Sequence, residues 1–177
     1  TAMTTSTEKT TDLLVAVLAD LSPVVAGVTE QQKDDPTPCT DYDVAQLMDH
    51  MTGWLSTFAD GFADPDGQAP RASLDGYVAP SDPAAEVRRA AATMEKALRD
   101  GAAARPLKLG EAAMPGELAL GMILWEYQMH GWDLARATGQ PRHQGCRRRD
   151  RGATGAGRGT PARRSSTAAC GRSAGRR

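Results

Sequence analysis

The chain of 177 residues suits a single domain, and its formal net charge of −1 conceals an uneven distribution of charge. Residues 1–140 hold 10 Lys and Arg against 21 Asp and Glu, whereas residues 141–177 hold 11 Arg against a single Asp. An acidic body disfavours nucleic-acid binding, which we expect at most weakly, through the basic tail. No stretch approaches the roughly 18 consecutive apolar residues of a membrane span, so no membrane partner is expected.

The first residues and the cysteines bear on the cellular compartment. Residues 1–12 lack the basic segment and apolar core of a secretory signal. Cys39 is the only cysteine among residues 1–140, which disfavours a disulfide framework and fits a reducing environment. The sequence therefore predicts a cytoplasmic protein.

Two amphipathic helices are predicted in the first half of the chain. Apolar residues recur at helical spacing over residues 6–28 and again over residues 44–62. The breaker-rich stretch "DDPTPCTDY" separates them and is predicted to be a loop. Asp43 precedes the second apolar stripe and is predicted to be its N-cap.

Two more helices are predicted in the second half. Ser81 is the expected cap of a helix over residues 82–100, with Pro83 tolerated in its first turn. "GAAARPLKLGEAAMPG" is predicted to be a loop before a fourth helix over residues 115–138, which Gly139 would end. Because no segment alternates clearly between apolar and polar residues, no strand is expected. Residues 1–141 are thus predicted to form an all-α four-helix bundle.

The tail over residues 142–177 differs in kind. After Pro141 there is no Val, Ile, Leu, Met, Phe, Trp or Tyr, so this Arg/Gly-rich segment is predicted to be disordered. Three interpretations stay open: a basic arm for anionic partners, an extension without a role, and translation of a shifted reading frame. The encoding DNA would distinguish the last from the others.

The fourth predicted helix carries "ILWEYQMHGWDLA", in which Glu126 and His130 lie one turn apart on one face. Asp133 follows three residues later, near the same face. The flanking residues are apolar almost all round, which predicts that this helix is the most buried of the four. A buried carboxylate and imidazole need partners, so the pair is either a metal site or a hydrogen-bonded pair that specifies packing.

His50 is the third candidate ligand, from the second helix. A lone histidine is more often a packed or surface residue, yet two histidines and one glutamate are the set that a catalytic metal ion needs. Zinc fits best, and nickel or non-haem iron would take the same ligands. The open coordination position of such a site can bind a thiol and deprotonate it.

Other candidates are weaker. Cys39 precedes the second helix, whose N-terminus would stabilise a thiolate, although a packed small residue is the simpler interpretation. The three tryptophans, Trp54, Trp125 and Trp132, are predicted to lie in the core. Arg136 is the candidate for binding an anionic group of a cofactor or substrate, although cations near helix C-termini are ordinary.

Two stretches, "VTEQQKDDPTPCTDYDVAQLMDHMTGWL" and "PGELALGMILWEYQMHGWDLARATGQP", resemble the mycothiol-dependent maleylpyruvate isomerase N-terminal family of actinobacteria. That family belongs to the DinB-like metal-binding four-helix bundles, and the resemblance covers about residues 8–141. It implies a divalent metal ion, typically zinc, at His50, Glu126 and His130, the three residues chosen above by placement. It also implies a low-molecular-weight thiol such as mycothiol, bound to the metal as thiolate.

The resemblance implies a thiol-dependent S-transferase or isomerase that acts on an electrophilic small molecule. Maleylpyruvate is not the expected substrate, because the isomerase has a further C-terminal domain and this chain turns Arg-rich where members continue with patterned sequence. Two alternatives remain: a non-catalytic metal-binding or stress-related bundle, with a homodimer possible, and a bundle without metal.

Overall fold

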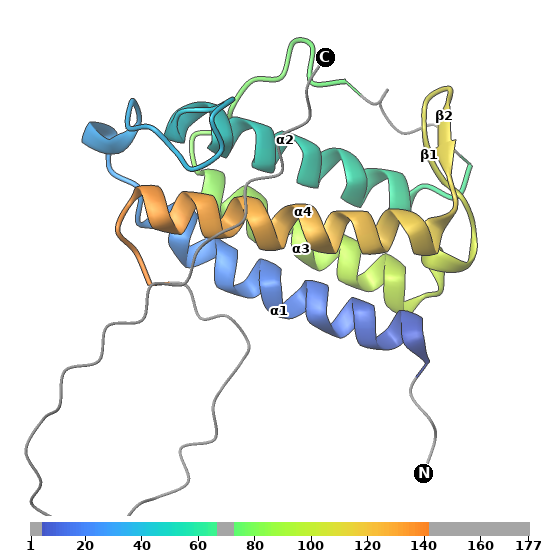
Figure 1. Ribbon diagram of the computed structural model, residues 1–177. Helices are drawn as coiled ribbons and strands as arrows, with labels where there is room; N and C mark the ends of the chain where they lie inside the picture. Colours follow the sequence, from blue (N-terminus) through green and yellow to red (C-terminus); the bar gives the residue numbers. More distant parts are fainter. Residues whose placement is uncertain (1–4, 67–72, 142–177) are drawn as a thin grey trace, which may run out of the picture. The chain divides into compact units, whose positions relative to one another are not determined.

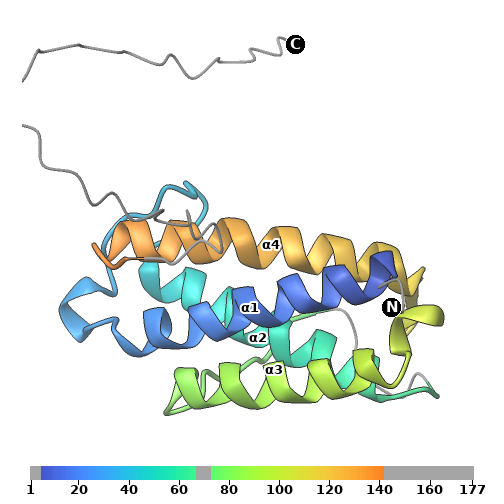
Figure 2. The same cartoon turned by 90° about the horizontal axis from the view of Figure 1, so that it is seen from below.

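Four long helices dominate the computed structural model, which describes residues 5–66 and 73–141 (Figure 1). They are α1 (Ser6–Ala26), α2 (Val44–Ala63), α3 (Pro83–Arg99) and α4 (Gly116–Ala137). Helices α1 and α2 each pack against both α3 and α4, as two views of the bundle show (Figures 1 and 2). The four-helix bundle predicted from the sequence is confirmed, whereas the disorder predicted for residues 142–177 lies outside the described part of the chain.

The core consists of the apolar stripes that the helical spacing predicted. The largest fully buried side chains come from all four helices and include Phe62, Leu14, Leu18, Leu21, Leu47, Met51, Leu55, Met94, Leu120, Ile123 and Leu134. One polar contact crosses this core, because the hydroxyl of Tyr127 on α4 donates to the carbonyl oxygen of Met51 on α2 at 2.7 Å. This bond satisfies a buried hydroxyl and fixes α4 against α2.

Capping side chains set where the second and third helices begin. Asp43 caps α2 as predicted: its carboxylate accepts from the backbone N–H of Gln46, whose side chain in turn accepts from the Asp43 N–H. The prediction that Ser81 caps the third helix was wrong by one residue, because Asp82 accepts the capping bond. Pro83 lies in the first turn of α3 as expected.

The end of α4 is tied to the end of α1. Gly139 has a φ of +66°, the left-handed conformation that glycine adopts most easily after a helix, as the sequence predicted. Directly after it, the Gln140 amide donates to the carbonyl oxygen of Val24 at 2.9 Å. The Gln32 amide donates to the carbonyl oxygen of Thr138 at 3.2 Å. These bonds to carbonyl groups in the last turn of α1 and at the C-cap of α4 hold the two helix ends together.

A small hairpin occupies the segment that was predicted to be a plain loop. Strands β1 (Leu107–Leu109) and β2 (Ala112–Met114) pair antiparallel around Gly110, which has a φ of +63°. Short 3-10 helices, η1 (Glu30–Gln32) and η2 (Ala102–Ala104), precede α2 and the hairpin. The hairpin packs on α2 so closely that a Cβ atom at Gly61 would lie 2.6 Å from the Leu109 side chain. The prediction of no strand was therefore wrong here.

The composition of α4 predicted that it would be the most buried of the four helices, and this prediction was wrong. It buries one side in the bundle and exposes large apolar side chains on the other, namely Leu118, Met122, Trp125, Met129 and Trp132. Trp125 is 65% exposed and Trp132 is 41% exposed, so their predicted place in the core was wrong. The physical reason is that each helix in a ring of four has two neighbours and one outward face. No helix of the described residues has the length and hydropathy of a membrane span.

Candidate metal centre

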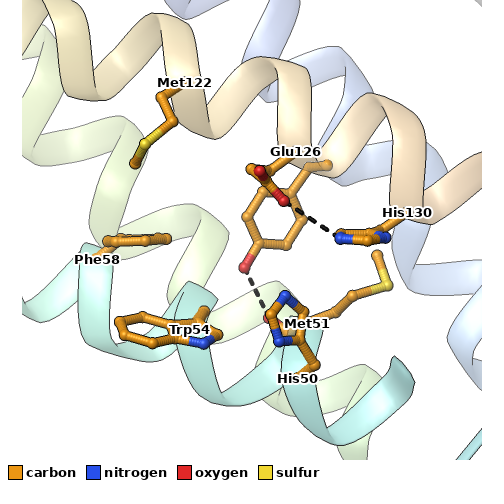
Figure 3. A pocket seen from close by; sticks show the side chains of 8 residues that line it. His50, Met51, Trp54, Phe58, Met122, Glu126 and His130 are labelled. Carbon is orange, nitrogen blue, oxygen red and sulfur yellow. Dashed lines mark hydrogen bonds and ion pairs between the residues drawn. The ribbon is translucent and has the colours of Figure 1, made fainter. Parts of the chain in front are cut away.

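The seam between α2 and α4 brings the three predicted ligands together (Figure 3). Glu126 and His130 lie one turn apart on α4, and His50 reaches them from α2. One ligand atom from each of the three side chains lies within 4.8 Å of the other two. The three side chains are only partly buried, with that of Glu126 40% exposed, so the donor atoms remain accessible to a small ligand.

The imidazole of His130 lies between two carboxylates. Its Nε2 is 3.2 Å from Glu126 Oε2, and its Nδ1 is 3.3 Å from Asp133 Oδ2. Asp133 is only 8% exposed, and its interaction with Nδ1 fixes the orientation of the ring. A carboxylate behind a histidine in this way is the usual support of a metal-binding imidazole. The sequence placed Asp133 near this face but gave it no role.

His50 is held in a similar way by a residue that the sequence did not suggest. The hydroxyl of Tyr42 and His50 Nδ1 are hydrogen-bonded at 3.2 Å, and the ring centroids are 4.8 Å apart. Burial lowers the pKa of His50 below its ordinary value of 6.5, His130 lowers it further, and Glu126 opposes the shift. The neutral ring is therefore favoured near pH 7, and neutral imidazole is the form that binds metal ions.

A cavity of about 250 Å³ opens beside these three side chains. Its remaining walls are mostly apolar and are formed by Met51, Trp54, Phe58, Met122 and Tyr127 (Figure 3). The rings of Trp54 and Phe58 are stacked, with centroids 5.4 Å apart. A second cavity of about 250 Å³ shares Trp54, Phe58 and Met122 and continues toward the hairpin, where Leu107, Leu109 and β2 line it. Polar donors thus lie at one end of an extended apolar space.

Comparison with known proteins identifies the family. Residues 14–135 match the model of the mycothiol maleylpyruvate isomerase N-terminal domain. The chain belongs to this family. Two curated relatives from Mycobacterium tuberculosis, Uncharacterized protein MT0763 of strain CDC 1551 and Uncharacterized protein Rv0738 of strain H37Rv, are each 32% identical over 117 residues. That alignment covers 66% of this chain and 60% of each relative. No solved structure matches the chain significantly.

Cys39 lies in the loop before α2, where the sequence placed it. Stabilisation of its thiolate by the helix N-terminus stays a prediction. Its Sγ atom lies within 4.8 Å of ligand atoms of both His130 and Asp133, a proximity that the sequence did not indicate. Cys39 is not among the residues that line the cavity beside His50.

Arg136, the predicted contact for an anionic group, lies on the exposed side of α4. It does not line either apolar cavity, and its side chain forms no hydrogen bond or ion pair with the part of the chain that the structure describes. Its role in binding stays a prediction.

Proposed function

We propose that the protein binds one divalent metal ion through His50, Glu126 and His130 and uses it in thiol-dependent chemistry on an electrophilic small molecule. The observation that supports this most is the convergence of three donor atoms within 4.8 Å of one another at one end of an apolar cavity. Membership of a family named for a mycothiol-dependent isomerase supports a thiol of the mycothiol type as the second component.

The donor set fits the proposed ion. Two imidazoles and one carboxylate form a catalytic zinc set that leaves coordination positions open, and nickel or iron would accept the same donors. Zinc is our first proposal among these ions. When bound, such an ion would lower the pKa of a thiol at its open position, so that the thiol reacts as thiolate.

The surrounding residues have separable roles in this proposal. Asp133 and Tyr42 hold His130 and His50 through their Nδ1 atoms, which would leave the Nε2 atoms for the proposed ion. Trp54, Phe58 and Met122 form an apolar wall that would exclude water from the thiolate and pack against a hydrophobic electrophile. Arg136, about one and a half turns beyond His130, remains our candidate for an anionic group of the thiol.

A conjugation assay tests the proposal. The purified protein is given zinc, a small thiol and 1-chloro-2,4-dinitrobenzene, and formation of the aryl thioether with release of chloride is followed. We expect metal-dependent turnover that is lost in Glu126→Ala and kept in Glu95→Ala, a carboxylate on α3 that pairs with Arg99. Metal binding without turnover on any electrophile would favour the non-catalytic alternative.

A further inference from the structure

Cys39, His130 and Asp133 form a second cluster of ligand atoms, distinct from the set that includes His50. One atom from each of the three side chains lies within 4.8 Å of the other two. Cys39 comes from the loop before α2, whereas the two other residues come from α4. Sulfur from the loop therefore lies close to an imidazole nitrogen and a carboxylate oxygen from α4, and only His130 belongs to both clusters.

The loop that carries Cys39 is held in place by its own hydrogen bonds. Pro36 and Asp43 form an antiparallel bridge that closes the loop. Inside it, the Thr37 hydroxyl lies 2.8 Å from the carbonyl oxygens of Cys39 and Tyr42 and donates to them. The Tyr42 N–H donates to the Cys39 carbonyl at 3.1 Å. These bonds fix the backbone that carries the thiol before any ligand arrives, which lowers the entropic cost of binding one.

The tautomer of His130 decides which cluster is available. A neutral imidazole carries one proton, so only one of its nitrogens can accept a metal ion. With the proton on Nδ1, the ring donates to Asp133 at 3.3 Å and Nε2 is free beside Glu126. With the proton on Nε2, the ring donates to Glu126 at 3.2 Å and Nδ1 is free on the side of Asp133, which belongs to the cluster with Cys39.

We propose that Cys39, His130 and Asp133 form a second cation site that takes a thiophilic divalent ion and competes with the His50 site for His130. Binding forms a metal–sulfur bond and releases the Cys39 proton to solvent. The thiolate and the Asp133 carboxylate then carry two negative charges that balance the ion, and a thiolate ligand favours softer metals over the nitrogen and oxygen donors around His50. Filling this site would withdraw His130 from the other.

Cadmium is the probe for this site, because a cadmium–thiolate bond gives an ultraviolet charge-transfer band. Cys146 and Cys170 are first replaced by serine, so that Cys39 is the only thiol of the three in the chain. We expect the band to grow to saturation at one ion per chain in this background. It should disappear in Cys39→Ser and remain in His50→Ala, which removes a ligand of the other site only.

Asp133→Asn provides the finer control, because it keeps the size of the side chain and removes its charge. We expect it to weaken cadmium binding by about tenfold or more while circular dichroism shows unchanged helicity. The proposal is overturned by any of three results in the background that lacks Cys146 and Cys170. These are absence of the band when Cys39 is present, persistence of the band in Cys39→Ser, and loss of the band in His50→Ala. Binding of two cadmium ions per chain would refute the competition for His130.

Discussion

His50 links the candidate site to the pH dependence of stability. Its pKa in the folded protein lies below the ordinary value of 6.5, chiefly because of burial, so the unfolded chain takes up this proton first as the pH falls. The metal-free protein should therefore lose stability as the pH is lowered from about 7 through 6.5, and His50→Gln should flatten that part of the profile. Urea unfolding of both proteins across this range measures the difference, and parallel profiles would contradict the assignment.

Tyr127 offers a test of the contact between α2 and α4. Burial raises the pKa of its hydroxyl well above the ordinary value, so the group remains a donor to the Met51 carbonyl at all physiological pH values. Tyr127→Phe removes this donor and leaves the cavity wall otherwise intact. We expect a loss of about 1 kcal/mol in the free energy of unfolding, measured with urea. No loss at all would mean that this bond does not stabilise the seam.

Individual site residues differed in how far the sequence could identify them. His50, Glu126 and His130 were chosen because helical periodicity places them on inward flanks of two long helices, and the structure brings them together. Tyr42 was not singled out, and Cys39 was considered only beside the helix N-terminus, since both lie in a loop whose path depends on hydrogen bonds between residues 36 and 43 that no periodicity encodes. Contacts between a loop and a helix distant in the sequence can be identified only when the fold is known.

At the scale of elements, the long helices were predictable and the short or one-sided features were not. Apolar stripes over about twenty residues specify a helix strongly, and capping residues such as Asp43 mark its start. The strands of the hairpin have three residues each, too few for alternation to be recognised. Helix α4 is apolar nearly all round, so its composition alone did not reveal which face the bundle would leave exposed.

The exposed face of α4 yields a prediction about stability. Trp125→Gln should change the free energy of unfolding by no more than about 0.5 kcal/mol, because the side chain is 65% exposed. Leu120→Ala, one turn earlier on the buried side of the same helix, should cost about 2–5 kcal/mol. Urea unfolding compares the two variants. Equal losses would show that the exposed tryptophan is covered in solution.

At the scale of the whole molecule, the buried apolar core of the described residues runs from residue 14 to residue 135, the same span that matches the family model. Residues 142–177 contain no Val, Ile, Leu, Met, Phe, Trp or Tyr, so they have no large apolar side chain to add to this core. Their removal should leave helicity and metal content unchanged and shift the melting temperature by only a few degrees. Calorimetry of the full and shortened chains tests this, and a fall of more than about 8 °C would imply that the tail stabilises the bundle.

The central claim is that His50, Glu126 and His130 bind one divalent metal ion, and elemental analysis tests it most directly. All three cysteines are replaced by serine, so that Cys39 cannot hold an ion in place of the proposed ligands. The protein is loaded with zinc and dialysed. We predict about one zinc ion per chain in this background and in Glu95→Ala, and loss of most of it in each of His50→Ala, Glu126→Ala and His130→Ala. Full zinc content in all three variants would contradict the account.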